Sequence, residues 1–253
     1  MLIDTHCHIH DSELFEGTTG VAAYERAVEA DVRKMLCIGT NEVSSREAVE
    51  FAENHPSSFA VVGVHPHDAK DGIAYIEQIL KDDHKKVVGI GEIGLDYYYN
   101  HSPKDVQIAA LEQQLQWAVD YMLPVSFHVR GAFADFWPVL QNFPGARGVL
   151  HSFTDTSESL ERGLSQGLYV GINGISTFTK DEAQRSMYDS IPLEKILLET
   201  DAPFLTPAPH RGKVNEPAFV RHVADYHANR RGMQTEAFAR VTSTNASTLF
   251  ALT

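Results

Sequence analysis

The sequence predicts a parallel (β/α)8 barrel formed as a single domain over residues 1–253. Eight short apolar runs, rich in β-branched residues, alternate with longer segments of helical period along the whole chain. Eight is the number of strands that a closed parallel barrel needs. A doubly wound open sheet is the alternative, but that fold carries a glycine-rich phosphate loop after its first strand. Here the first strand is followed by His6-Cys7-His8-Ile9-His10.

The expected elements follow one another in regular order. The strands are expected at Leu2–His6, Lys34–Ile38, Phe59–Val64, Val87–Ile93, Val125–Val129, Gly148–His151, Leu168–Ile172 and Ile196–Glu199. The helices are expected at Val21–Ala30, Val43–Glu53, Ile73–Leu80, Lys104–Tyr121, Ser157–Gln166, Glu216–Arg230 and Thr235–Phe250. Pro103 is expected at the first helical position of the strongest of these helices. Strands that alternate with helices indicate a parallel sheet.

Composition and charge exclude several classes of protein. The two cysteines lie in apolar runs, which suits buried reduced thiols better than a disulfide framework. The start of the chain shows no secretory signal and no apolar run is long enough to span a membrane, so we expect a cytoplasmic protein without a membrane partner. A net charge of -13 argues against non-specific coating of nucleic acid. A polyanionic substrate would need a local basic patch or bound metal.

Metal-type ligands recur where the expected strands end. Because the loops that follow parallel strands open on one face of a barrel, these side chains should lie on one rim. In the first strand the alternation of side chains places two imidazoles on the same face. Imidazole and carboxylate groups together suit divalent cations. The candidates are His6, His8, Glu92, His128, His151 and Asp201.

Several motifs together resemble the TatD family of metal-dependent deoxyribonucleases. They are Asp4-Thr5-His6-Cys7-His8, Gly63-Val64-His65-Pro66, Gly91-Glu92-Ile93-Gly94-Leu95-Asp96, Glu199-Thr200-Asp201-Ala202-Pro203-Phe204-Leu205, Arg211-Gly212-Lys213 and Asn215-Glu216-Pro217. The resemblance covers nearly the whole chain in order. It implies an amidohydrolase-like TIM barrel that hydrolyses phosphodiesters in DNA, often from the 3′ end.

The resemblance also implies a set of metal ligands. One divalent cation would be held by His6, His8, Glu92 and Asp201, and a second by Glu92, His128 and His151. As a carboxylate, Glu92 has two oxygens and could bridge the two ions, and Asp201 is our candidate for the general base. The mixed donors leave zinc, magnesium, manganese and nickel open.

Substrate contacts are expected from His65 and from three cations, Arg130, Arg211 and Lys213, which could take phosphate oxygens from DNA or an oligonucleotide. In many members of the family a second arginine stands at the position of Val214, so one possible phosphate contact is missing here. The tyrosine run 97–99 could stack a base. We expect His10 and His67 to be ordinary loop or solvent histidines.

Two other functions stay open at this point. A small-molecule amidohydrolase or phosphotriesterase would commonly use a carboxylated lysine as its bridge at the fourth strand, where this chain presents Glu92. A metal-binding scaffold without turnover would tolerate loss of the three cations. The oligomeric state is left open, with a monomer as the simplest case.

Overall fold

The fold is described from a computed structural model, which describes residues 1–11, 14 and 19–252. Eight strands form one sheet in the order β1-β2-β3-β4-β5-β6-β7-β8. They are β1 (Leu2–Cys7), β2 (Val32–Ile38), β3 (Ser58–Val62), β4 (Val87–Asp96), β5 (Val125–Arg130), β6 (Gly148–Leu150), β7 (Tyr169–Ile172) and β8 (Ile196–Leu198). The last strand lies beside the first, because Cys7 forms a parallel bridge with Ala202. This order confirms the predicted (β/α)8 class, the TIM barrel.

Helices separate the strands in sequence. They are α1 (Gly20–Glu29), α2 (Glu42–Asn54), α3 (Ala74–Lys81), α4 (Lys104–Asp120), α5 (Phe133–Gln141), α6 (Ser157–Ser165), α7 (Ile175–Phe178), α8 (Glu182–Ser190), α9 (Val220–Arg230) and α10 (Thr235–Phe250), with 3-10 turns η1 (Ala69–Asp71), η2 (Leu193–Lys195) and η3 (Pro217–Phe219). No helix in the described part of the chain is long and apolar enough to cross a membrane.

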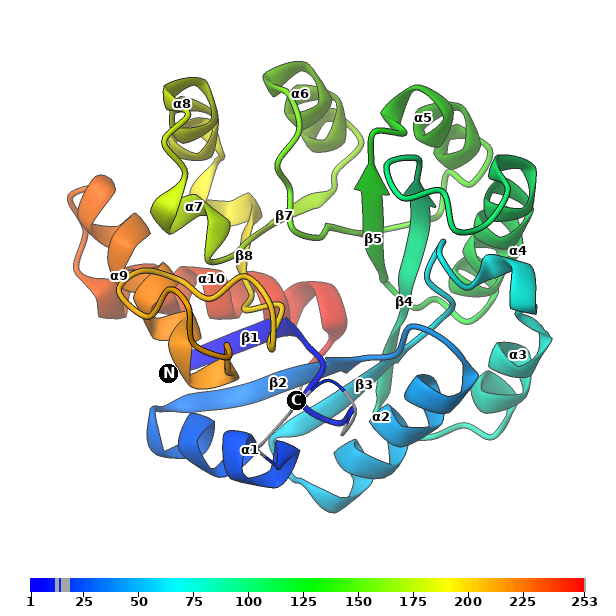
Figure 1. The fold of residues 1–253 in the computed structure, drawn as a ribbon, viewed down its shortest axis with the longest axis horizontal. Helices are drawn as coiled ribbons and strands as arrows, with labels where there is room; N and C mark the ends of the chain where they lie inside the picture. The colour runs from blue at the N-terminus through cyan, green and yellow to red at the C-terminus, as the bar shows by residue number, and fades with distance from the viewer. Residues whose placement is uncertain (12–13, 15–18, 253) are drawn as a thin grey trace. The chain divides into compact units, whose positions relative to one another are not determined.

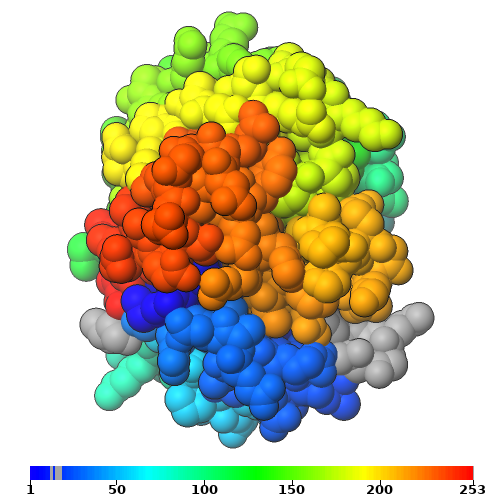
Figure 2. Space-filling view, turned by 90° about the vertical axis from the view of Figure 1, so that its left-hand side faces the viewer, coloured from blue at the N-terminus to red at the C-terminus, as the bar shows by residue number. Residues whose placement is uncertain are grey.

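The chain forms two compact units, one of residues 1–37 with 152–253 and one of residues 38–151. In the first unit, hydrogen bonds join β1 to the end of β8. The hydroxyl of Thr5 donates to the carbonyl of Leu198 at 3.0 Å, and the carboxylate of Asp4 accepts from both the amide and the hydroxyl of Thr200. Both ends of the chain belong to this unit, and Figure 2 shows the C-terminal helices in orange and red next to the N-terminal residues in blue.

In the second unit, α4 holds the ends of two strands through buried glutamines. The side chain of Gln114 accepts from the amide of Val64 at 2.8 Å and donates to its carbonyl at 3.2 Å, just after β3. Gln107 makes the same pair of contacts with Asp96 at the end of β4, at 2.9 and 3.1 Å. Helices α2 to α5 lie on one side of the strands of this unit (Figure 1). The loops after β3 and β4 are therefore fixed by side-chain amides from one helix.

The eight predicted strands are all present, with ends within three residues of the expected positions. The placement of Pro103 was wrong, because it is the N-cap residue of α4 and not its first helical residue. The segment expected as one helix from Glu216 is divided into η3 and α9. Three helices, α5, α7 and α8, were not predicted. Pro138 inside α5 removes one backbone donor and hides the helical pattern of that segment.

Candidate metal centre

Glu92 lies in β4, and its side chain is surrounded by three histidines of the second unit. One of its oxygens, Oε1, is 2.7 Å from Nδ1 of His128, 3.7 Å from Nε2 of His65 and 3.8 Å from Nε2 of His151. Glu92 is only 5% exposed. A buried carboxylate costs free energy unless it is paired, so one oxygen surrounded by three imidazoles indicates a site built to hold positive charge. In particular, His65, Glu92 and His128 could each offer a ligand atom to one metal ion.

Asp96, at the end of β4, supports this group from the other side. Its Oδ2 lies 3.0 Å from Nε2 of both His128 and His67. Its Oδ1 accepts from the backbone amides of Tyr98 and Tyr99 at 2.9 and 3.1 Å. Asp96 is 1% exposed. His128 is therefore held between two carboxylates, each of which contacts one of its ring nitrogens.

The side chains around Glu92 shift one another's pKa values. Burial alone would lower the pKa of His128, but the carboxylates of Asp96 and Glu92 outweigh it and raise the pKa to about 9. Burial would raise the pKa of Asp96, yet the hydrogen bonds from His128 and from two backbone amides hold it well below its usual range. His65 has a lowered pKa because of burial and the neighbouring His128. The carboxylate of Asp96 is therefore kept ionised beside His128.

The first unit contributes His6 and His8 from β1 and Asp201 from the segment after β8. Oδ1 of Asp201 is 3.7 Å from Nε2 of His6 and 3.5 Å from Nε2 of His8. Asp201 has a φ of 59°, in the left-handed region that few residues other than glycine adopt. Its amide donates to the carbonyl of His6 at 2.8 Å, which holds the turn against β1. This backbone turn directs the carboxylate of Asp201 to both imidazoles.

Burial also shifts the pKa values of Asp4 and His10, which lie close to His6 and His8 in the sequence. It raises the pKa of Asp4 to about 8, although hydrogen bonds from Thr200 and from the amide of His6 oppose the shift. His10 is buried, and burial lowers its pKa well below the ordinary value. His10 lies in the turn that follows β1, in agreement with the expectation of a loop or solvent histidine, but it is buried rather than exposed to solvent.

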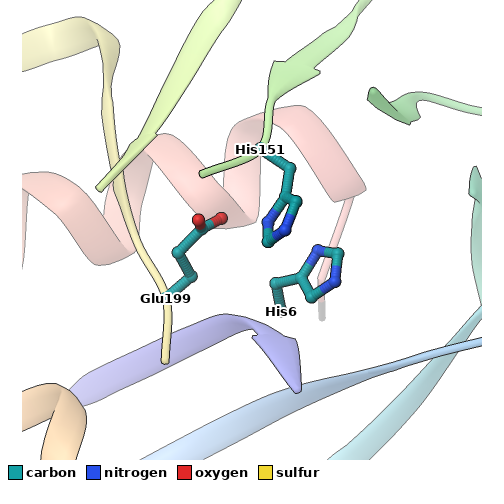
Figure 3. A group of neighbouring side chains, drawn as sticks. All are labelled: His6, His151 and Glu199. Atoms are coloured by element: carbon teal, nitrogen blue, oxygen red, sulfur yellow. The ribbon is translucent and has the colours of Figure 1, made fainter. Parts of the chain in front are cut away.

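Glu199, directly after β8, is a fully buried carboxylate that we did not predict as part of the site. Its Oε1 accepts from the amide of Ser152 at 2.7 Å and from the side-chain amide of Asn173 at 3.2 Å. Figure 3 shows its carboxylate together with the imidazole of His6, from the ends of β8 and β1. The glycine at 171 leaves room for it, because a Cβ there would lie 2.3 Å from Oε2 of Glu199.

The predicted substrate-binding residues are found in different surroundings. His65 is part of the Glu92 group, and its Nδ1 accepts from the amide of His67 at 3.2 Å. Arg130 ends β5, paired with Asp96 in the ladder between β4 and β5. Arg211 donates to the carbonyl of Thr206 at 2.8 Å, with its guanidinium 3.7 Å above the ring of Phe178. Lys213 is exposed in the same loop as Arg211.

The donor set fits divalent cations. Each unit presents imidazole nitrogens within 4 Å of carboxylate oxygens. Neutral imidazole with carboxylate is the ligand combination that zinc, manganese and related ions accept. The residues that could hold metal are His6, His8 and Asp201 in the first unit and His65, Glu92, His128 and His151 in the second.

Sequence reasoning missed Asp96, Glu199 and the contact of His67 with Asp96. Asp96 and Glu199 both stand in motifs that carry the family resemblance, so their positions after strands were visible. What the sequence lacks is the register that brings Asp96 opposite Arg130 and near His128. That register includes a shift between Ile90 and Ile93 of β4.

Comparison with known proteins agrees with this geometry. The sequence profile of the family described as TatD related DNase matches residues 3–251. The chain is 35% identical to the metal-dependent hydrolase YabD of Bacillus subtilis, over 99% of both chains. It is 37% identical to the 3′-5′ ssDNA/RNA exonuclease TatD of Citrobacter rodentium, over 90% of both. The crystal structure of YJJV, a TatD homologue from Escherichia coli K12, superposes with a TM-score of 0.91 at 29% identity, covering 100% of this chain and 98% of that one. The chain therefore belongs to the TatD family of metal-dependent hydrolases.

Proposed function

We propose that this protein is a phosphodiesterase that hydrolyses single-stranded DNA from the 3′ end with two divalent cations. The proposal rests on the surroundings of Glu92: one of its two carboxylate oxygens, Oε1, lies within 3.8 Å of three imidazoles. Such a carboxylate can serve two ions at once. A relative with 37% identity carries the name of a 3′-5′ ssDNA/RNA exonuclease, which supports the choice of substrate.

We carry over the ligand sets from the family resemblance. His6, His8, Asp201 and Glu92 would hold one cation, and Glu92, His128 and His151 the other. Bound cations would activate a water molecule and neutralise charge on the attacked phosphate. Zinc, magnesium, manganese and nickel all suit these donors.

The chain's own residues would perform the remaining steps. Asp201, 15% exposed at its side chain, would accept the proton of the attacking water. Arg130, Arg211 and Lys213 would contact phosphate oxygens, because a chain of net charge -13 needs local cations to hold a polyanionic substrate. Such a protein would act in the cytoplasm, as a single-domain monomer in the simplest case.

The experiment compares metal content and cleavage in purified variants. Chelation of the parent should abolish cleavage of end-labelled single-stranded DNA, and added manganese or zinc should restore it with products that shorten from the 3′ end. His128→Ala should retain about one equivalent of metal, because the first ligand set remains. Glu92→Ala should retain less, because it removes the charge that lets two cations lie ~4 Å apart.

The matched control is Glu77→Ala, which removes an exposed carboxylate from the same unit, paired with Lys81 at 3.0 Å. It should leave metal content and cleavage unchanged. The proposal fails if the parent cleaves DNA at full rate when its metal content is negligible. It also fails if Glu92→Ala keeps two equivalents of metal and the parental rate.

A further inference from the structure

Four exposed side chains gather at the ends of β4 and β5. Tyr98 and Tyr99 are 67% and 54% exposed and pack edge to face, with ring centroids 4.9 Å apart. The guanidinium carbon of Arg130 lies 4.0 Å from the ring centroid of Tyr98 and 4.9 Å from that of Tyr99. The ring of His101 stacks on Tyr99 with centroids 5.8 Å apart at 15°. We call Tyr98, Tyr99, His101 and Arg130 the aromatic platform.

We propose that the aromatic platform binds an unpaired base of single-stranded DNA by stacking. The inference rests on the proposed function and assigns a subsite to it. Every base has a π face, so stacking on tyrosine binds single strands without a sequence requirement. The guanidinium of Arg130 adds a positive charge beside the rings, which suits a ligand that carries phosphates.

Hydrogen bonds through Asp96 connect the aromatic platform to His128, which contacts Glu92. Asp96 accepts from the amides of Tyr98 and Tyr99 through Oδ1 and contacts His128 through Oδ2. The ring of His67 is near both, with its centroid 5.6 Å from that of Tyr99 and 6.3 Å from that of His128. One imidazole therefore connects the platform to a proposed metal ligand. A base stacked on Tyr99 would belong to a nucleotide at or next to the phosphate that is hydrolysed.

Tyr97, the first residue of the tyrosine run, has a different role. Its hydroxyl donates to Asp135 at 2.9 Å, and the ammonium of Lys104 lies 3.9 Å above its ring. Its hydroxyl contacts α5, one face of its ring contacts α4, and its side chain is only partly exposed. Tyr98 and Tyr99 also have Arg130 over their rings, but more than half of each residue remains exposed to solvent.

The test measures binding to two hydrolysis-resistant phosphorothioate oligonucleotides by fluorescence anisotropy, with metal-loaded protein. One is single-stranded oligothymidylate, and the other has the same backbone with abasic sugars at its 3′ end. Tyr98→Ala and Tyr99→Ala should raise the Kd for oligothymidylate by about 5- to 100-fold, the range expected when stacking of one base is lost. The parent should bind the abasic strand more weakly by a similar factor, and the alanine variants should bind that strand as the parent does.

The controls separate stacking from general damage. Tyr98→Phe and Tyr99→Phe keep the ring and should bind oligothymidylate as the parent does. Tyr121→Ala changes a tyrosine at the C-cap of α4, before β5 and away from the platform, and should have no effect. Equal Kd values of the parent for the two strands, or an equal loss on both strands in the alanine variants, would overturn the platform. Tight, tyrosine-dependent binding without any cleavage of an ordinary phosphodiester would instead retain the platform and refute the proposed hydrolysis.

Discussion

Asp96→Asn tests how far metal binding depends on the carboxylate behind His128. The asparagine keeps one oxygen for the amides of Tyr98 and Tyr99, but it places an NH2 group where Oδ2 now meets two imidazole nitrogens, each at 3.0 Å. Two of four contacts are lost, and both involve a charged acceptor. Removing such a partner of a metal ligand typically lowers metal affinity 10- to 100-fold, or about 1.4–2.7 kcal/mol.

The assay is calorimetric titration of chelator-treated protein with manganese or zinc. We expect the binding event that involves His128 to lose affinity by this factor, while the event that involves His6 and His8 stays the same. Asp135→Asn is the control, because Asp135 is an acceptor for Tyr97 in the same unit and contacts no proposed ligand in the described hydrogen-bond network. Parental affinity at both events in Asp96→Asn would refute the idea that Asp96 orients His128.

Two further predictions concern the free energy of unfolding, one through the pKa of His227 and one through the packing of Glu199. Burial lowers the pKa of His227 from 6.5 to about 3, so between these values the unfolded chain binds a proton that the folded chain does not, and stability falls as pH falls. From pH 7.5 to 5 the parent should lose roughly 2 kcal/mol more unfolding free energy in urea than His227→Gln, which stays neutral, and parallel curves would contradict this. Gly171→Ala should displace Glu199, since the new Cβ would lie 2.3 Å from Oε2, and lower the unfolding free energy by roughly 1–3 kcal/mol. Gly145→Ala is the control, because its φ is not left-handed and a Cβ there would make only ordinary van der Waals contacts with Val119, at 3.5 and 3.7 Å.

The strand ends and their ligands could be predicted because both signals are local in sequence. An apolar run fixes where a strand lies, and the residue that follows it must lie at the strand's carboxyl end. His65, Glu92, His128 and His151 are brought together as this reasoning requires. Their role as metal ligands stays a prediction.

The hydrogen bonds that support the ligands could not be predicted, because they depend on pairing between elements. Asp96 reaches His128 only through the register of β4 with β5, and Glu199 reaches Ser152 and Asn173 from a different strand. The helix α8 is a different case. Asp181 accepts from the amides of Ala183 and Gln184, a capping signal that is readable in the sequence and was overlooked.

The paired glutamines of α4 bear on which insertions this chain can accept. Gln107 and Gln114 are seven residues apart, two helical turns or ~10.5 Å along the axis, and so they face the same way. One residue added or deleted between them would turn one amide by about 100° away from its loop. The stretch between these glutamines should therefore keep a constant length among related chains.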